Sequence, residues 1–556
     1  MQKTCPHCRQ EFKISDQDLA FLNKVSPVFA GKQESIPPPQ TCPDCRLQQH
    51  LAFRNERKLY HRKCDLTGKQ IISVYAPDSP QKIYAQNEWW SDAWNARDFA
   101  RDIDWNRPFF AQFQDLFRSV PLPHIHMESC ENFEYGNFCW GSSDCYLTFG
   151  SDGSRNCYYS HLLYNCTDCV DCSYCKECTY CYELLDSEKC YRCFYSKELL
   201  NCESVDFSID CKSCKNCFGC TGLRHKQYCL FNEQLTEKEY KSRLVELIVT
   251  QEAIDIAGKK AMDLWKKQPR LAARLVQCED CTGDNLLQCK SCTDCFDGVG
   301  GRDCVRVQNM PGQSVDCHDI YAAGHGAELC YNGYCIASHR THFSFLIYPT
   351  GDNVLYSALC ASCNNIFGCV GLQHQEYCIF NKQYSKEEYE RLVPQLIAHM
   401  RKTGEWGEFF PVTLSPFAYN ETVANEFFPL SQEEAARRGW DWRVQRQEED
   451  YLGPETPVPS SIARVDESIT QKILRCHSTG KLYKIIPQEL SFYRDHGLPV
   501  PILCPDERHR QRMEKRNPRK LWKRTCDSCH TPISTTYAPD RHEIVYCEAC
   551  YTKAVA

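Results

Sequence analysis

The sequence contains no long apolar run. No stretch of 18 residues is apolar enough to cross a bilayer, so we expect no membrane-spanning segment and no membrane partner. The first residues, Met1 to Cys8, also lack the apolar core of a secretory signal peptide. Cysteines stay reduced in a protein that is not exported. We therefore expect a cytoplasmic protein of bacterial type.

Motifs that carry common catalytic chemistries are missing as well. The sequence has no phosphate-cradling glycine loop, no Gly-x-Ser-x-Gly elbow and no His-Glu-x-x-His helix. One cluster mixes nucleophile and base types: Cys317, His318 and Asp319, with His325 and His339 nearby. Asp and His are also ordinary residues of turns. We therefore expect a protein that is not an enzyme.

An excess of positive charge is absent too. The 65 Lys and Arg residues are outnumbered by 72 Asp and Glu residues, which gives a formal net charge of −7. This balance argues against a protein that wraps nucleic acid over its whole surface, although it permits a local basic site. At 556 residues, the chain is long enough for three to five domains.

Cysteine, by contrast, is abundant, with 42 copies. From Cys130 to Cys229 it returns every nine residues, and only Thr148 and Leu184 interrupt the column. The column consists of Cys130, Cys139, Cys157, Cys166, Cys175, Cys193, Cys202, Cys211, Cys220 and Cys229. A short fixed period predicts stacked repeats that bury their faces on one another. Nine residues cannot close a coil, so we expect a β-solenoid with 18-residue coils and cysteines along its inside.

Three interpretations of this cysteine ladder are open. The thiols can fill a narrow core as small, buried side chains. They can instead hold zinc or an iron–sulfur cluster, because Cys166, Cys169 and Cys172 overlap a ferredoxin spacing, although the proline of that motif is missing. They can also form disulfides, which a reducing compartment disfavours. We favour the structural interpretation.

The end of this region recurs 149 residues later. Residues 218–232, with a Phe-Gly-Cys and a Tyr-Cys-x-Phe-Asn motif, are matched by residues 367–381. A capping box follows each copy, at Thr236 to Glu239 and at Ser385 to Glu388, and predicts the start of a helix. We therefore expect a second solenoid with a looser register, and a helix that caps each solenoid.

Both ends of the chain carry Cys-x-x-Cys pairs. Four thiolates are the ligand number of structural zinc, so two intact quartets predict two structural zinc ions per chain. The predicted ligands are Cys5, Cys8, Cys42 and Cys45 in the first module and Cys526, Cys529, Cys547 and Cys550 in the last.

The two modules are copies of each other. The interval from Cys42 to Cys64 equals that from Cys504 to Cys526, and a Tyr-Ala-Pro-Asp motif follows in both. Each copy has lost one site, whose remaining cysteines are Cys64 in the first copy and Cys476 with Cys504 in the last. The lost positions hold Thr67, Ala85 and Glu88, and Thr479 and Glu507. These thiols are either buried or, with His477 or His509 as substitute ligands, metal-bound; we favour burial.

The first module, from Cys5-Pro-His-Cys8 to Cys42-Pro-Asp-Cys45, resembles the small probable zinc-ribbon domain of many bacterial proteins. The whole chain, through its Phe-Gly-Cys endings to the closing ribbon, resembles a family of cysteine-rich, zinc-ribbon-flanked proteins of small-genome bacteria. The resemblance implies zinc binding and no particular activity.

A basic segment leads into the last quartet. Between Arg508 and Arg524, nine Lys or Arg residues accompany the single acid Glu514. They are Arg508, Arg510, Arg512, Lys515, Arg516, Arg519, Lys520, Lys523 and Arg524. Cations clustered beside a zinc ribbon are typical of phosphate contacts, so we predict that this segment binds RNA, the ribosome or DNA. The alternative is a solvated helix face.

Residues 84–117 hold ten aromatic residues. Phe109, Phe113 and Phe117 recur at helical spacing behind Pro108, which predicts a helix. Exposed rings could stack on bases, but we expect the segment to cap the first coil of the first solenoid.

Together these patterns predict a β-rich, multidomain protein with two cysteine-lined β-solenoids, each capped by a helix and flanked by duplicated zinc-ribbon modules. The expected parts are a zinc-ribbon module at 1–90, an aromatic cap at 91–129, the first solenoid at 130–235, its capping helix at 236–270, the second solenoid at 278–384, a helical segment at 385–445, a linker at 446–468 and a zinc-ribbon module at 470–556. We predict a non-enzymatic zinc protein that binds nucleic acid. The alternatives are an iron–sulfur or multi-zinc redox protein and a protein-interaction scaffold.

Overall fold

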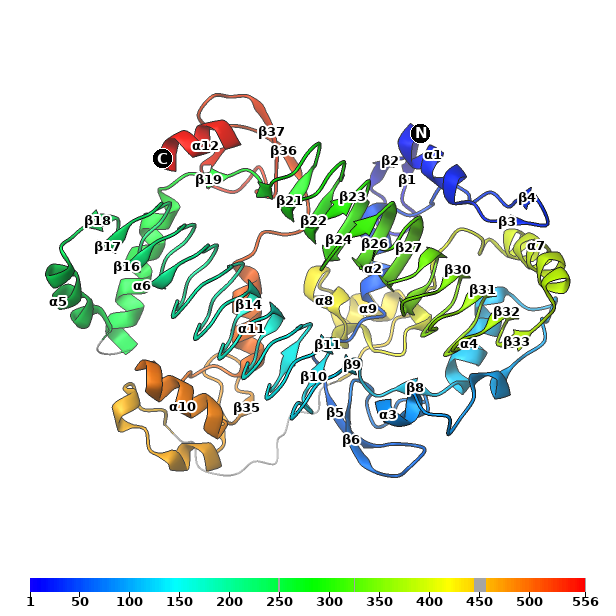
Figure 1. Cartoon of the computed structure of the whole chain (residues 1–556), viewed down its shortest axis with the longest axis horizontal. Helices are drawn as coiled ribbons and strands as arrows, with labels where there is room; N and C mark the ends of the chain where they lie inside the picture. Colours follow the sequence, from blue (N-terminus) through cyan, green and yellow to red (C-terminus); the bar gives the residue numbers. More distant parts are fainter. Residues whose placement is uncertain (249–250, 325, 445–456, 556) are drawn as a thin grey trace.

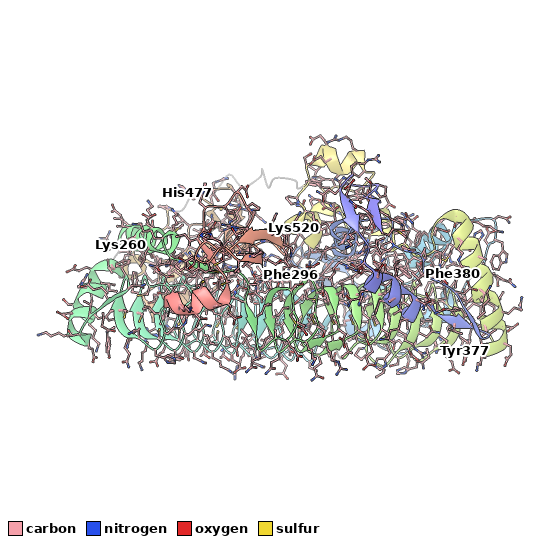
Figure 2. All side chains as sticks on the ribbon, turned by 90° about the horizontal axis from the view of Figure 1, so that it is seen from above. Lys260, Phe296, Tyr377, Phe380, His477 and Lys520 are labelled. Atoms are coloured by element: carbon pink, nitrogen blue, oxygen red, sulfur yellow. The ribbon has the colours of Figure 1, made fainter. Side chains whose placement is uncertain are left out.

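The computed structural model describes residues 1–248, 251–324, 326–444 and 457–555. Two stacks of flat coils lie side by side, the first built from residues 127–234 and the second from residues 275–383 (Figure 1). In Figure 2 the coils form the lower layer, and the labelled His477 and Lys520 of the C-terminal module lie above them. The molecule is therefore β-rich, and part of its C-terminal module lies above the coils.

The first stack has a twelve-residue repeat, as in the hydrogen bond from Cys172 N to Ser160 Oγ. Its strands are β9 (Met127–Glu128), β10 (Gly136–Asn137), β11 (Cys139–Trp140), β12 (Thr148–Phe149), β13 (His161–Tyr164), β14 (Ser173–Lys176), β15 (Glu203–Asp206), β16 (Lys215–Phe218), β17 (Gln227–Leu230) and β18 (Glu233–Gln234). The strands β16 and β17 pair in parallel, with Cys217 opposite Cys229. Isolated bridges such as Thr167 to Thr179 have the same offset. The predicted 18-residue coil is therefore wrong, and one coil takes twelve residues.

Each coil of the first stack consists of three-residue units. Asn165 and Asp168, which directly precede the buried Cys166 and Cys169, have φ values of 52° and 51°. A left-handed residue at every third position turns the chain, so that four such corners close a coil. This conformation costs an ordinary L residue about 1–2 kcal/mol, and Asn, Asp and Gly adopt it most readily. These three residue types are accordingly frequent at the corners.

The ladder thiols donate hydrogen bonds to backbone carbonyls nine residues later. Cys166 Sγ donates to the carbonyl oxygen of Cys175 at 3.4 Å, and Cys172 Sγ donates to that of Cys181 at 3.4 Å. A thiol thus contacts the backbone nine residues later. The residue that stacks on it lies one full coil, or twelve residues, later, as Cys229 stacks on Cys217. Both intervals are multiples of the three-residue unit, so the sequence period does not equal the coil length.

The second stack has the looser register that the sequence predicts. Its strands are β20 (Leu275–Val276), β21 (Gly283–Leu287), β22 (Cys295–Val299), β23 (Gly301–Arg302), β24 (Val305–Met310), β25 (Ser314–Val315), β26 (Cys317–Ala323), β27 (Cys330–Ile336), β28 (His339–His342), β29 (Phe345–Ile347), β30 (Asp352–Leu355), β31 (Asn364–Phe367), β32 (Glu376–Ile379) and β33 (Lys382–Gln383). The partners Cys317 and Cys330, in β26 and β27, lie one residue farther apart in sequence than partners in the first stack. The partners Tyr331 and His342, in β27 and β28, lie one residue closer.

Helices follow both stacks. The first stack is followed by α5 (Glu237–Ile248) and α6 (Gln251–Lys266), on either side of residues that lie outside the described part. The second is followed by α7 (Lys386–Thr403). Both predicted capping boxes are confirmed, because Glu239 N donates to Thr236 Oγ1 at 3.3 Å and Glu388 N donates to Ser385 Oγ at 3.2 Å.

The aromatic segment packs mainly against the second stack. It contains α3 (Gln86–Trp89), η1 (Ala96–Phe99) and α4 (Phe109–Ser119), and α4 confirms the predicted helix. The Phe109 ring lies 5.5 Å from Phe367 and 5.3 Å from Phe380. Asn381 Nδ2 donates to the carbonyl of Ala96 at 2.9 Å. The segment therefore covers the last coils of the second stack. It also contacts the start of the first stack, because Met127 N of β9 donates to Gln86 Oε1 of α3 at 2.9 Å.

The duplicated modules join the stacks in the same way. The first comprises β1 (Gln2–Thr4), β2 (Glu11–Lys13), α1 (Asp16–Val25), β3 (Val28–Phe29), β4 (Lys32–Gln33), α2 (Pro43–Leu51), β5 (Tyr60–Lys63), β6 (Gln70–Ser73) and β7 (Ile83–Tyr84). The last comprises β34 (Leu474–Arg475), β35 (Leu482–Tyr483), α10 (Pro487–His496), α11 (Pro505–Glu514), β36 (Trp522–Thr525), β37 (Pro532–Thr535), β38 (Val545–Tyr546) and α12 (Glu548–Val555). Strand β7 pairs with β8 (Leu122–Pro123), which leads into the first stack, and β38 pairs with β19 (Arg270–Leu271), which leads into the second.

Short helices fill the region between the second stack and the last module. They are η2 (Val412–Leu414), η3 (Tyr419–Glu421), α8 (Val423–Phe427), α9 (Gln432–Arg437), η4 (Ile462–Arg464) and η5 (Glu467–Gln471). The predicted linker at 446–468 lies partly outside the described residues, and its described part contains η4 and the start of η5.

Candidate metal centres and the junction between the stacks

Four turns of one geometry carry the cysteines of the terminal modules. They begin at Cys5, Cys64, Cys476 and Cys526. In each turn, the backbone N–H of the cysteine donates to the carbonyl oxygen of the fifth residue after it. The backbone N–H of the fourth residue after the cysteine donates to the carbonyl oxygen of the cysteine. All these donor–acceptor distances are 2.8–2.9 Å. The fourth residue after the cysteine has a positive φ in every turn, as at Arg9 (64°) and His530 (60°). Each module therefore keeps two metal-site turns, as the duplication predicts.

The first quartet brings its four sulfurs together at the start of α2. The Sγ atoms of Cys5, Cys8, Cys42 and Cys45 all lie within 4.8 Å of one another, and Cys8 Sγ is 3.5 Å from Cys42 Sγ. Cys42 is the N-cap of α2, where the helix dipole favours a thiolate. A hydrogen bond from Cys45 lowers the pKa of Cys42 to about 5.

The second quartet is built in the same way from the other end of the chain. Cys526 and Cys529 flank the turn between β36 and β37, and Cys547 and Cys550 lie at the start of α12. All four sulfurs again lie within 4.8 Å, with Cys529 Sγ 3.7 Å from Cys547 Sγ. The Thr531 hydroxyl group lowers the pKa of Cys529 to about 6 by hydrogen bonding.

Both quartets could hold a metal ion. Tetrahedral zinc with Zn–S bonds of about 2.3 Å places its sulfurs about 3.8 Å apart. The sulfur separations of 3.5 Å and 3.7 Å are close to that value. Four thiolates and no other nearby ligand are the donor set of a closed structural site.

The two depleted sites keep their backbone but not their ligands. Cys64 Sγ accepts the N–H of Ala85 at 3.2 Å, as Cys526 Sγ accepts that of Cys547 at 3.3 Å. Glu507, which stands at a lost position of the last module, instead pairs with Arg510 at 2.7 Å. Within the described residues, no groups of three or more potential ligands besides the two quartets lie close enough to share an ion.

Neither histidine named as a substitute ligand joins these cysteines in such a group. His509 is buried and lies 3.7 Å from Glu426, and its ring meets that of His161 at 5.4 Å. His477 is exposed to solvent. The buried-thiol interpretation of Cys64, Cys476 and Cys504 fits these positions, since all three side chains are buried.

Four guanidinium groups of the basic segment are buried at the junction between the stacks. The side chains of Arg508, Arg512, Arg516 and Arg519 are at most 9% exposed. Arg512 pairs with Asp171 of the first stack at 2.7 Å. Arg516 reaches both stacks, because it pairs with Asp186 at 3.0 Å and with Asp297 at 2.5 Å. Arg516 therefore joins the two stacks, and none of the four groups faces solvent.

The other cations of the segment lie nearer the surface. Arg510 pairs with Glu507 and Glu514, Lys515 lies 3.6 Å from Glu183, Lys520 lies 3.8 Å from Asp44, Arg524 lies 3.5 Å from Asp527, and Lys523 is exposed. Nucleic-acid binding by the whole segment stays a prediction, and the burial of Arg508, Arg512, Arg516 and Arg519 gives it no support.

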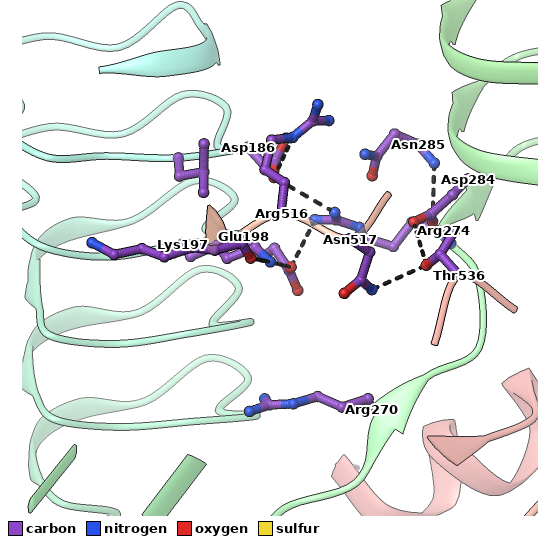
Figure 3. A network of polar contacts seen from close by, with 12 residues as sticks. Asp186, Lys197, Glu198, Arg270, Arg274, Asp284, Asn285, Arg516, Asn517 and Thr536 are labelled. Atoms are coloured by element: carbon purple, nitrogen blue, oxygen red, sulfur yellow. Dashed lines mark hydrogen bonds and ion pairs between the residues drawn. The ribbon is translucent and has the colours of Figure 1, made fainter. Parts of the chain in front are cut away.

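A polar network extends this junction toward the entry of the second stack (Figure 3). Arg274 lies 3.4 Å from Glu198 of the first stack. Its backbone N–H donates to Asp284 at 2.8 Å, and Asp284 also accepts from the Thr536 hydroxyl group at 3.2 Å. Asn517 donates to the same hydroxyl group at 3.0 Å. These hydrogen bonds join the C-terminal module to the junction between the stacks.

The sequence patterns did not identify the carboxylates that form ion pairs with the buried arginines of the two modules. Asp171, Asp186, Asp297 and Asp319 all occupy left-handed corners of the coils, with φ between 49° and 54°. A corner side chain points out of the coil, so an acid there is available to a neighbouring element. Acidic residues directly before inward-facing positions are the signal that could have identified them.

The ladder cysteines behave as structural thiols. None of the 42 cysteines forms a disulfide. Within the described residues, no three ladder thiols are close enough to share an ion. Burial raises the pKa of Cys139 to about 12, so its thiol is neutral and can donate to a carbonyl oxygen. At Cys172 burial also raises the pKa, but hydrogen bonds with the neighbouring thiols of Cys169 and Cys175 lower it to about 5. These observations favour a packed interior over sites in which three or more ladder thiols share one metal ion.

The side chains of Cys317, His318 and Asp319 point to three different environments and do not form a common site. Cys317 Sγ donates to the carbonyl of Ala327 at 3.0 Å inside the coil. His318 stacks on Phe21 at 3.4 Å, and Asp319 pairs with Arg46 at 2.8 Å. His325 lies outside the described residues, and His339 is exposed. The three consecutive side chains therefore hold the coil and the first module together.

No known protein-family model matches the chain, and no curated protein is similar to it in sequence. The resemblance to zinc-ribbon-flanked proteins therefore stays a prediction. None of the described helices is both long enough and apolar enough to cross a membrane.

Proposed function

We propose that the protein is a non-enzymatic scaffold in which two β-solenoids are held side by side by duplicated zinc-ribbon modules. The proposal has one zinc ion in each quartet, Cys5 to Cys45 and Cys526 to Cys550. The observation that carries it is that each module places a buried arginine between the stacks. Arg54 of the first module lies over the rings of Phe138 and Tyr321, one from each stack. Arg516 of the last module pairs with Asp186 and Asp297, again one from each stack.

Zinc contributes to this scaffold by folding the modules. Binding of a structural zinc ion is coupled to folding, because its ligands come together only in the folded chain. In the first module, Cys42 and Cys45 fix the start of α2, and Arg46 on the same turn reaches Asp319. Loss of the ion would free the helix that places this arginine.

The scaffold proposal includes a reducing compartment such as the cytoplasm. The buried, hydrogen-bonded thiols support it, because a narrow interior filled by cysteines is kept free of cross-links only where thiols stay reduced. The partner is a macromolecule, either nucleic acid or protein, bound on the surfaces that the two stacks and the modules expose.

Metal analysis of protein purified without oxygen and without added metal tests the proposal. We expect about two zinc ions per chain and, after removal by a strong chelator, a lower melting temperature. Iron with labile sulfide would instead favour the iron–sulfur alternative. Full retention of the melting temperature after complete zinc removal would contradict a scaffold held by zinc.

A further inference from the structure

The second stack begins with two coils that each carry a Cys-x-x-Cys pair. The first pair is Cys278 with Cys281, and the second is Cys289 with Cys292. Each of these four cysteines directly follows a residue in the left-handed conformation, with φ between 51° and 54°: Gln277, Asp280, Gln288 and Ser291. The residue after such a corner points into the coil, so all four thiols face the interior at the start of the stack.

The first pair lies directly over the second. Glu279 and Lys290, each directly after the first cysteine of its pair, face each other in a parallel bridge. Glu279 N donates to the carbonyl oxygen of Cys289 at 3.0 Å, and Thr282 N donates to that of Cys292 at 2.8 Å. The first cysteine of one pair therefore stacks on the first cysteine of the other, and the second on the second, at one coil step of about 4.8 Å.

This start of the second stack is open to solvent. Among the cysteines outside the two quartets, the four that are not buried are Cys130, Cys278, Cys281 and Cys335. Two of these four share one coil. Cys278 Sγ donates to the carbonyl oxygen of Val276 at 3.4 Å, and Cys281 Sγ donates to that of Glu279 at 3.2 Å. An ion from solvent can therefore reach thiols here that already have a stacked thiol behind them.

Two stacked thiols suit a soft, monovalent metal ion. Thiolate sulfur selects Cu(I) over harder ions, and Cu(I) can bind two thiolates in a line. With metal–sulfur bonds of about 2.3 Å, the length found for zinc, two sulfurs on opposite sides of an ion lie about 4.6 Å apart. One coil step of about 4.8 Å is close to that separation. Zinc instead requires four ligands, and within the described residues no three of these thiols lie close enough to share an ion.

We propose that the open start of the second stack binds two Cu(I) ions, one between Cys278 and Cys289 and one between Cys281 and Cys292. Each ion replaces two thiol protons, which leave to solvent, and no electron is transferred because copper enters as Cu(I). Each unit of two thiolates and one ion then carries a single negative charge. A buried charge is costly, so the partly exposed coil is a better site than the enclosed ladder. This inference goes beyond the scaffold function.

Anaerobic titration of the reduced, zinc-loaded full chain with Cu(I), in competition with a chromophoric Cu(I) chelator, tests the inference. We expect about two copper ions per chain and no release of zinc. Cys278→Ser with Cys281→Ser should abolish this uptake at the same chelator concentration, because serine keeps the hydrogen bonds but binds Cu(I) poorly. Each single substitution should retain about one ion. Zinc content and melting temperature of the variants show that they are folded.

Cys130 provides the matched control. It is also partly exposed and lies in the first coil of its stack, but the equivalent contact, Glu131 N to a carbonyl oxygen at 3.1 Å, is made to Ser142. Cys130 therefore stacks on a hydroxyl group, and Cys130→Ser should leave copper uptake unchanged. X-ray absorption at the copper edge should show two sulfur neighbours for each ion.

Three results would overturn the inference. The first is the absence of copper uptake by the wild type. The second is uptake that is equal in the wild type and in Cys278→Ser with Cys281→Ser. The third is copper with three or four sulfur neighbours that displaces zinc, because it would place the ions in the quartets. If the double serine variant does not fold, Cys278→Ala with Cys281→Ala repeats the comparison without a buried hydroxyl group.

Discussion

Arg508 of the last module and Asp171 of the first stack form an ion pair of 2.7 Å, with side chains only 3% and 0% exposed. Arg46 of the first module and Asp319 of the second stack form the same pair at 2.8 Å. Arg46 and Arg508 each lie four residues after the cysteine of a Cys-Pro-Asp motif. The first module thus contacts the second stack, and the last module contacts the first stack. The two copies of the module therefore share an interface as well as a fold.

Removal of a carboxylate from this interface should be strongly destabilising. Asp171 also pairs with Arg512 at 2.7 Å, so Asp171→Ala leaves two buried cations without this partner. We expect a loss of about 3–5 kcal/mol in the free energy of unfolding, measured by chemical denaturation. The control Asp263→Ala removes an exposed partner of Lys266 and should change stability by less than about 0.5 kcal/mol. Similar effects of the two substitutions would show that the buried pair does not hold the last module to the first stack.

The two metal sites should empty independently. Cys8→Ser and Cys529→Ser each remove one thiolate from a quartet, so each variant should retain about one zinc ion per chain and the double variant none. Cys64→Ser, in a depleted site, should retain both ions. Elemental analysis by mass spectrometry gives these numbers. Loss of zinc from Cys64→Ser would mean that the depleted site also binds metal.

The interior of the first stack should accept serine more readily than leucine. Ser196, at an inward position, donates its hydroxyl group to the carbonyls of Phe194 at 2.9 Å and Val205 at 3.1 Å. Cys175 donates to the corresponding carbonyls of Ser173 and Leu184. Cys175→Ser should therefore cost less than about 1 kcal/mol, since the hydrogen bonds survive.

Cys175→Leu is the matched test of size at the same position. It should cost about 1–3 kcal/mol by overpacking, because Cys175 is fully buried. Thermal unfolding of both variants gives the comparison. A leucine variant as stable as the serine variant would show that the interior is not close-packed.

Acid should weaken the contact between the first module and the second stack. His50 is buried, its ring lies 2.7 Å from Asn332 Oδ1, and burial lowers its pKa to about 4. An unfolded histidine has a pKa near about 6.5, so between these values the unfolded chain binds more protons. Stability should therefore fall as the pH drops from about 6.5 to about 4, by up to about 1.4 kcal/mol per pH unit for this group.

Denaturation of wild type and His50→Gln across this pH range measures the effect. The variant should show a shallower fall in stability, because one titrating group is gone. The exposed His477 provides the control substitution His477→Gln, which should leave the slope unchanged. Identical slopes for wild type and His50→Gln would exclude His50 as a source of the acid sensitivity.

Local patterns in the sequence predict the parts of the fold that depend on neighbouring residues. The thiol quartets, the capping boxes at Thr236 and Ser385 and the helix behind Pro108 all follow from short spacings. The coil length does not, because inward positions at every third residue suit any multiple of three. The twelve-residue offset between paired strands, as between Cys217 and Cys229, shows that four units close a coil.

The role of the basic segment could not be read from charge alone. A cluster of arginines looks the same in sequence whether it faces phosphate or buried carboxylates. Asp171, the partner of Arg512, lies 341 residues earlier in the chain. Asp186, the partner of Arg516, lies 330 residues earlier. Both pairings depend on how the last module is placed against the first stack, which no local pattern encodes.

Arg512 reaches two consecutive coils at once, since it pairs with Asp171 at 2.7 Å and with Glu183, at the equivalent position of the next coil, at 3.0 Å. Adjacent coils are separated by about 4.8 Å, so one guanidinium group spans a single step. An inserted coil between these two acids would carry Glu183 out of reach. During evolution, such a chain can gain or lose only whole coils. The coils that carry Asp171 and Glu183 must stay adjacent, because Arg512 of the last module pairs with both.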